Sequence, residues 1–198
     1  MKISYSIMAV PERKEFVEEL LKELGDVPVA WENGSGIWDT RCRAMLMRPE
    51  DSTHHVVIQD DAILCNNFKE KVEKYVLKYP DCAISLYMGT RDRESFKKNV
   101  VPLITDAEEN NRDIIDYNWL GWGVGLVLPS NTIQDIIFFW NNKERWLRHD
   151  DSRIGTYLVK HNIKLIYTYP SLVDHRESMS IIENKQTIRK AYKFEGRK

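Results

Sequence analysis

Apolar and polar residues alternate along the chain with two different periods, and the pattern predicts strands and helices in turn. Residues 3–9 ("ISYSIMA") have the composition of a strand, and Pro11 then stands where the first turn of a helix accepts a proline. Apolar residues recur at helical spacing from Phe16 to Leu24, and Gly25 follows at the position that ends many helices. The chain therefore begins with a strand and an amphipathic helix.

The same two periods continue to residue 169. Further strands are expected at 27–31, 55–59, 82–88, 122–128 and 163–169. Helices are expected at 39–47, from Phe68 to Tyr79, after the "SNT" of 130–132, and at about 150–160. Residues 89–113 are expected to form a long polar connection. The pattern predicts one α/β domain, residues 1–180, around a mostly parallel sheet, followed by a basic and partly helical tail, residues 181–198.

Composition and charge exclude several classes of protein. The 198 residues include 29 Lys and Arg against 30 Asp and Glu, so the net charge of −1 shows no bias toward polyanions. The hydrophobic content of 42% is that of a globular protein. Three cysteines without a CxxC pair indicate free thiols in a reducing compartment. No apolar run approaches the ~20 residues of a membrane span, and a strand explains the N-terminus better than a signal peptide, so we expect a cytoplasmic protein.

Two aspartates stand side by side where an apolar strand ends. Asp60 and Asp61 follow the run "VVI" of residues 56–58. Since desolvating even one carboxylate is costly, such a pair indicates a bound cation, and a divalent metal is the first candidate. The alternative is a strand-end pair that caps the next segment or faces water. In α/β sheets of this kind, ligands collect at the carboxyl ends of the strands, where this pair lies.

Two later segments carry further candidates. His175 follows a strand and a Pro-Ser turn, where an imidazole either completes an oxygen-rich metal site or has a structural role. Asp150 and Asp151 open the helix expected at 150–160, and interaction with the helix N-terminus explains one of them. The second acid is then a candidate general base that faces a cleft.

Three arginines are candidates for binding a diphosphate. Arg13 follows the first strand, whereas Arg41 and Arg43 lie on the helix after the Gly-rich loop 32–36, together with Trp38. Planar guanidinium groups suit diphosphate oxygens because they donate paired hydrogen bonds. At least one of the three is expected to be an ordinary solvated charge. The "GSG" of the loop matches neither a Walker loop nor a Rossmann fingerprint, so it receives no phosphate-binding role.

Taken in order, these segments resemble a small glycosyltransferase of the GT-A fold over most of residues 3–178. "VVIQDDAILCNNF" resembles the "LEDD" segment of the family 25 (lipopolysaccharide-type) glycosyltransferases and, more loosely, the DxD motif of nucleotide-sugar enzymes. "GWGVGLVLPS" resembles their Gly-rich strand beside the donor sugar, and "HDDSRIGTYL" the acidic helix start that faces the acceptor. "PSLVDH" resembles the late segment whose histidine contacts the metal or the diphosphate. Small phage-encoded and bacterial glycosyltransferases are also similar, including the "MAVPER" opening.

The resemblance implies a metal-dependent enzyme that takes a sugar from a nucleoside-diphosphate sugar, with UDP-sugars favoured and Mn²⁺ or Mg²⁺ as cofactor. It makes Asp61 and His175 the metal ligands and Asp150 or Asp151 the catalytic base. The donor-binding residues that it implies are Pro11, Arg13, Trp38, Arg41, Asp60, Trp122 and Gly123.

The acceptor would be a hydroxyl group of a glycan or a lipid-linked sugar in the cytoplasm of a bacterium or of a phage-infected host. A hydroxymethylated DNA base is the alternative acceptor, and the basic tail would then track phosphates.

Gln59 departs from the motif because it stands at the position of the first acid of DxD and carries no charge. Two alternatives therefore stay open. One is a catalytically silent module that binds a nucleotide sugar. The other is a metal-dependent nucleotidyltransferase, which is expected to have a Gly-rich, Arg-containing loop after the first strand, where this chain has "MAVPER".

Overall fold

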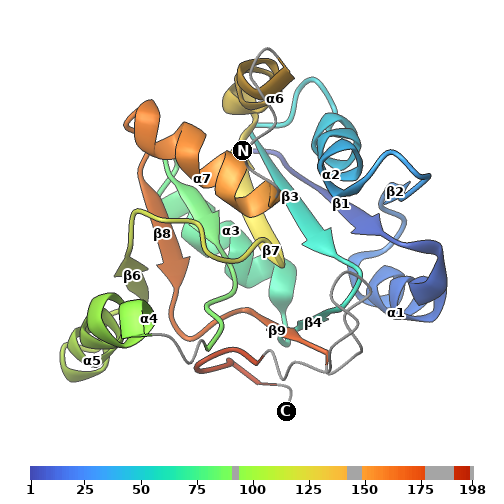
Figure 1. Cartoon of the computed structure of the whole chain (residues 1–198). Helices are drawn as coiled ribbons and strands as arrows, with labels where there is room; N and C mark the ends of the chain where they lie inside the picture. Colours follow the sequence, from blue (N-terminus) through green and yellow to red (C-terminus); the bar gives the residue numbers. More distant parts are fainter. Residues whose placement is uncertain (91–93, 142–148, 177–189, 197–198) are drawn as a thin grey trace.

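The computed structural model describes residues 1–90, 94–141, 149–176 and 190–196 (Figure 1). At its centre lies a seven-stranded sheet in the order β2-β1-β3-β7-β5-β8-β6. Its strands are β1 (Ile3–Ala9), β2 (Val29–Trp31), β3 (His54–Gln59), β5 (Ala83–Ser85), β6 (Ile114–Asp116), β7 (Gly125–Pro129) and β8 (Leu165–Thr168). The strands β2, β1, β3, β5 and β8 run in one direction, and only β7 and β6 run against them. The predicted α/β fold with a mostly parallel sheet is confirmed.

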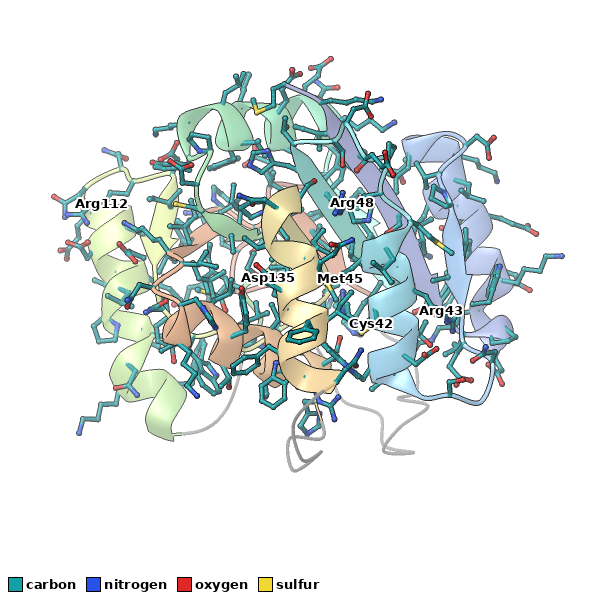
Figure 2. The ribbon with its side chains drawn as sticks, turned by 90° about the horizontal axis from the view of Figure 1, so that it is seen from above. Cys42, Arg43, Met45, Arg48, Arg112 and Asp135 are labelled. Carbon is teal, nitrogen blue, oxygen red and sulfur yellow. The ribbon has the colours of Figure 1, made fainter. Side chains whose placement is uncertain are left out.

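Helices cover both faces of this sheet. The helices α1 (Lys14–Leu24) and α3 (Phe68–Lys78) pack on one face, and α2 (Ile37–Leu46), α6 (Ile133–Asn141) and α7 (Asp150–Lys160) on the other. Neighbouring strand residues point to opposite faces, so Ile7 joins the core under α1 and α3 whereas Met8 joins the core under α2 and α6. Figure 2 shows α6 beside α2, with Asp135 on the first helix and Met45 on the second.

A histidine buried under α2 ties that helix to the two central strands. His55 of β3 has no exposed surface, and its Nδ1 lies 2.8 Å from the hydroxyl of Ser4. Its Nε2 lies 2.9 Å from the hydroxyl of Ser6 and 3.0 Å from the carbonyl oxygen of Ala44. Burial, which disfavours the charged imidazole, lowers the pKa of His55 to about 4. The ring is therefore neutral at pH 7.

The prediction of a long polar connection at 89–113 missed two helices. The structure has two helices there, α4 (Glu94–Asn99) and α5 (Val101–Glu109), and they lead into β6 at one edge of the sheet (Figure 1). Phe96, Val100, Ile104 and Ala107 are buried, at spacings of four, four and three residues. This is a helical period, and the run "VVPL" of residues 100–103, with a proline and adjacent apolar residues, hid it.

Two short strands that the sequence pattern did not predict form a second small sheet. β4 (Ala62–Leu64) pairs with β9 (Val173–His175) in antiparallel fashion, beyond the carboxyl end of β3 (Figure 1). Residues 190–196 continue at this end through bridges between Ala191 and Gly89 and between Phe194 and Ser171. The rest of the tail, 181–189 and 197–198, falls outside the described residues. In the described part of the chain, no helix is long and apolar enough to cross a membrane.

Candidate functional site

The pairing of β4 with β9 brings together two side chains that are 114 residues apart in the sequence. Ala62 stands opposite His175, and the backbone N–H of Arg176 donates a hydrogen bond of 2.8 Å to the carbonyl oxygen of Asp61. As a result, His175 Nε2 lies 3.2 Å from Asp61 Oδ2, and both side chains are more than nine-tenths buried. The expected convergence of these two residues is therefore present, and what they bind stays a prediction.

Asp60 organises the end of β1 next to them. Its Oδ2 accepts a 2.8 Å hydrogen bond from the backbone N–H of Val10, and its Oδ1 lies 2.9 Å from Arg13 Nη1. The same guanidinium nitrogen reaches Asp61 Oδ2 at 2.5 Å. Arg13 closes the short 3-10 turn η1 (Pro11–Arg13) and stands at the N-cap of α1, whereas Pro11 is exposed. One arginine thus bridges both acids of the pair.

Burial and charge act differently on the two carboxylates. Burial and the neighbouring charge of Asp61 raise the pKa of Asp60. Burial alone would also raise the pKa of Asp61, but the hydrogen bond and charge of His175 and the charge of Arg13 outweigh it and lower that pKa. Of the two acids, Asp61, which faces the imidazole, therefore keeps its charge down to the lower pH.

His175 and Asp61 meet the requirements for two ligands of a divalent cation. The Nδ1 of His175 lies 2.7 Å from the carbonyl oxygen of Arg176, which only accepts, so Nδ1 carries a proton. Nε2 is then the ring nitrogen that would bind a cation, once it has given up the proton it shares with Asp61. Adjacent ligands about 2.1 Å from a six-coordinate cation lie about 3.0 Å apart, close to the observed 3.2 Å between Nε2 and Oδ2. The buried Oδ1 of Asp61 has no hydrogen-bond partner among the described residues. In that part of the chain no cluster of three or more His, Cys, Asp or Glu suits a metal ion, so water and phosphate oxygens would complete the shell.

The Gly-rich segment, residues 121–125, is hydrogen-bonded to the residue that precedes the acidic pair. The backbone N–H of Gln59 donates a 2.8 Å hydrogen bond to the carbonyl oxygen of Val124, just before β7 begins. The carbonyl oxygen of Gly123 accepts a 2.8 Å hydrogen bond from Arg41 Nη2. A Cβ atom at residue 123 would lie only 2.7 Å from that Nη2, so the residue has to be glycine for the arginine to fit.

Arg41 and Asp150 form a buried ion pair in which neither is free to act on a substrate. Arg41 Nε lies 2.6 Å from Asp150 Oδ2, and the arginine side chain has no exposed surface. The pair joins α2 to the first turn of α7. The donor contact expected from Arg41 and the role of base expected from Asp150 are therefore not part of the function proposed below.

Asp151 is the acid at this helix start that is not committed to a buried ion pair. Its Oδ1 accepts a 2.6 Å hydrogen bond from the backbone N–H of Ser152. Burial and the charge of Asp150 raise the pKa of Asp151. Its Cβ would lie 3.6 Å from a Cβ at residue 123, which puts the carboxyl group beside the Gly-rich segment.

Trp122, predicted to bind the donor sugar, packs in a cluster of aromatic rings. Trp122 is half-buried, and its indole meets Tyr87, Phe96 and Tyr167 edge-on, at centroid distances of 6.3, 5.9 and 6.2 Å. Tyr87 also lies 6.3 Å from the ring of His175, so this cluster connects the Gly-rich segment to the histidine.

The other two predicted residues of α2 have partners within the protein. Trp38 faces the guanidinium of Arg153 at 5.0 Å, and Arg43 pairs with Asp39 at 2.8 Å within the helix.

Sequence reasoning missed Arg176. Its backbone carbonyl fixes the ring of His175, and its guanidinium pairs with Glu19 and lies 4.7 Å over the ring of Phe16. It links α1 to the small sheet, and no local signal marks it because all of these partners except its neighbour are far away in the sequence.

Comparison with known proteins gives the fold and no family. Neither a family model nor a curated protein matches the chain. Among solved structures, the crystal structure of A197 from STIV matches with a TM-score of 0.54 and 12% identity, over 90% of this chain and 87% of that one. A Drosophila β-1,4-galactosyltransferase 7 variant in complex with manganese, UDP-Gal and xylobiose matches with a TM-score of 0.47 and 8% identity, over 93% and 75% of the two chains.

Apo mouse xyloside xylosyltransferase 1 matches with a TM-score of 0.38 and 12% identity, over 82% of this chain and 71% of that one. At identities this low, a structural match shows similarity of fold and not of function. The two matches with a TM-score below 0.5 support no further conclusion. The comparisons give no support to family 25 in particular. The chain is thus an α/β protein whose fold is similar to that of A197, with an Asp–His–Arg site at the carboxyl ends of its central strands.

Proposed function

We propose that this protein is a metal-dependent glycosyltransferase that moves a sugar from a nucleoside-diphosphate sugar to a hydroxyl acceptor, with UDP-sugars favoured as donors. The observation that carries the proposal is the meeting of Asp61 and His175 beside Arg13. A carboxylate and an imidazole of fixed tautomer suit a divalent cation, and an adjacent guanidinium suits the diphosphate that such a cation binds.

At the donor end, Asp61 and His175 would hold Mn²⁺ or Mg²⁺, which as a Lewis acid would stabilise the charge on the departing diphosphate. Asp60 would fix the backbone of Val10 and the guanidinium of Arg13, so that this arginine meets the diphosphate at the end of β1. Trp122 would pack against a face of the donor sugar, as aromatic rings with an apolar face do. Contacts of Pro11 and Trp38 with the nucleotide stay predictions.

At the acceptor end, Asp151 would be the catalytic base and Asp150 the residue that keeps it in place. In an inverting transfer, Asp151 would take the proton of the acceptor hydroxyl, and such assistance contributes about 10²–10⁴-fold to the rate. Its raised pKa suits this role because a base works best when its pKa approaches the working pH. The acceptor would be a glycan, a lipid-linked sugar or a hydroxymethylated DNA base.

A silent nucleotide-sugar binding module is the second candidate, and Gln59 is the observation that favours it. The side chain at the position of the first DxD acid is uncharged, and it stands at the end of β3 next to Asp60. Such a module would bind the donor with Asp61 and His175 but would release no nucleoside diphosphate.

Turnover of a donor panel tests the proposal against this alternative. The protein is incubated with UDP-, GDP-, CDP- and TDP-sugars and Mn²⁺, and the nucleoside diphosphate released to water or to an added acceptor is measured. We expect release from at least one donor, its loss in EDTA, and a fall of 100-fold or more in Asp61→Asn and in Asp151→Asn.

Asp51→Asn is the matched control, because Asp51 is an exposed aspartate that pairs with Lys2 at the far end of the sheet. Donor binding in a thermal-shift screen without any release would favour the silent module.

A further inference from the structure

In the structure, the positively charged side chain of Arg13 lies between the carboxylates of Asp60 and Asp61. Arg13 Nη1 lies 2.9 Å from Asp60 Oδ1 and 2.5 Å from Asp61 Oδ2, and its side chain is only 13% exposed. Two buried carboxylates side by side repel each other, and this guanidinium offsets the repulsion. The charges of both acids in turn raise the pKa of Arg13 despite its burial, so the guanidinium keeps its proton.

The same contact competes with a divalent cation. The oxygen of Asp61 that accepts from Arg13 is the one that faces His175 Nε2, so a metal ion shared by Asp61 and His175 would lie close to the guanidinium. Like charges at such short range repel strongly in a poorly solvated site. One of the two cations therefore has to leave Asp61 for the other to bind well.

Arg13 lies outside the sheet, in the turn between β1 and α1. It stands at the N-cap of α1, after the exposed Pro11, and its long side chain reaches the acids from the edge of the sheet. Asp60 keeps its hydrogen bond to the Val10 N–H whether or not the guanidinium moves. A diphosphate at the end of β1 would offer the guanidinium new anionic partners close by.

We propose that Arg13 is a resident cation that couples metal binding to donor binding. In the donor-free protein it neutralises Asp60 and Asp61 and weakens metal binding. When the donor binds, its diphosphate pairs with the guanidinium of Arg13, and Asp61 is then able to bind the metal together with His175. Metal and donor therefore strengthen each other's binding by more than their direct contact explains, and this coupling acts in both directions. The inference rests on the proposed function.

Metal affinity of the donor-free protein tests this role without any turnover. The dissociation constant for Mn²⁺ is measured from the electron paramagnetic resonance signal of free Mn²⁺, first without nucleotide and then with saturating UDP. We expect Arg13→Gln to bind Mn²⁺ without nucleotide at least tenfold more tightly than the wild type, about 1.4 kcal/mol. Arg13→Lys, which keeps the charge, should stay within threefold of the wild type.

Arg112→Gln is the control variant. Arg112, labelled in Figure 2, pairs with Asp106 on an exposed surface just before β6, the edge strand farthest from β2 and β1. The control should leave the Mn²⁺ affinity unchanged, and an unaltered melting profile of Arg13→Gln should show that the variant is folded. Saturating UDP should tighten Mn²⁺ binding more in the wild type than in Arg13→Gln.

The outcomes separate this inference from the proposed function. Wild-type protein that binds Mn²⁺ and a variant Arg13→Gln that binds it equally or more weakly would overturn the resident-cation role and leave the proposed function standing. A wild type that binds no Mn²⁺, with or without UDP, would overturn both.

Discussion

Replacing Asp150 by asparagine removes the carboxylate that pairs with the buried guanidinium of Arg41. Arg41 has no exposed surface, its Nε lies 2.6 Å from the lost charge, and its Nη1 finds no hydrogen-bond partner in the described part of the chain. The remaining contact, from Nη2 to the carbonyl of Gly123, is to a neutral group. An almost isosteric change therefore removes the paired carboxylate of a buried guanidinium and leaves Asp151 as the acid whose charge still acts on it.

The expected loss in the free energy of unfolding can be taken from buried ion pairs that have been broken in other proteins. Breaking a buried pair by removing one partner destabilises proteins by about 3–5 kcal/mol, a large part of a total stability of about 5–15 kcal/mol. For a chain of this size, each kcal/mol lowers the melting temperature by about 2–4 °C, so Asp150→Asn should melt about 6–20 °C below the wild type. Urea unfolding at pH 7, with the same probe for all variants, measures the change in the free energy of unfolding.

Asp151→Asn is the matched comparison, because the substitution is the same and the site is the next residue. The Asp151 carboxyl accepts from Ser152 and forms no buried ion pair with the residues that the structure describes, so the variant should lose less than about 1 kcal/mol in stability. A double variant, Arg41→Met with Asp150→Leu, should lose less than the sum of the two single changes, because no charge is left unpaired. If Asp150→Asn stayed within 1 kcal/mol of the wild type, or if Asp151→Asn cost as much, the division of labour argued for the two acids would be refuted.

Three further predictions concern the same face of the sheet. Gly123→Ala should lower stability by about 1–3 kcal/mol and slow donor turnover, since its Cβ would lie 2.7 Å from Arg41 Nη2; Gly121→Ala, whose Cβ meets its nearest atom at 3.9 Å, should stay within about 0.5 kcal/mol, and urea titrations of both compare them. The pKa of His55 is lowered from 6.5 to about 4, so the unfolded chain takes up the proton first, and stability should fall by about 3 kcal/mol as the pH drops from 6.5 to 4; a His55→Asn variant with the same slope would contradict this. The pKa of Asp151 is raised above the ordinary 3.8, so the carboxylate needed as base is lost on acidification at a pH above 3.8. The rate of sugar transfer should therefore decline on the acidic side of the pH–rate profile, and the profile of Asp151→Asn should lack this acidic decline.

The strands and the larger helices could be predicted because they follow from local pattern. β1, α1, α2, α3 and α7 lie within two residues of their predicted ranges, each with an apolar face of the expected period. The helices α4 and α5 were missed because the run "VVPL" of residues 100–103, with a proline and adjacent apolar residues, obscures the helical period of Phe96, Val100, Ile104 and Ala107. β4 and β9 were missed because each has only three residues, too few to show an alternation of apolar and polar positions. These strands form only because they pair with each other.

Part of the candidate site was predictable for a similar reason. The chemistry of Asp60, Asp61 and His175 could be read from residue type and position at strand ends. What the sequence does not contain is which charges pair. Arg41 pairs with Asp150, 109 residues further along the chain, and Arg13 pairs with two acids that follow it by 47 and 48 residues. Both pairings therefore depend on the assembled sheet. The sequence alone left Asp150 and Asp151 as equal candidates for the base, and the buried partner of Asp150 distinguishes them.

The central claim is that one cation is held by Asp61, His175 and a diphosphate together, and electron spin-echo modulation of bound Mn²⁺ tests it most directly. In the complex of wild-type protein with Mn²⁺ and UDP, we predict couplings to the phosphorus of UDP and to the nitrogen of one imidazole. The nitrogen coupling should disappear in His175→Gln and persist in His161→Gln, a histidine at the far end of α7. A spectrum with phosphorus coupling but no imidazole nitrogen, or one whose nitrogen coupling survives in His175→Gln, would contradict the account.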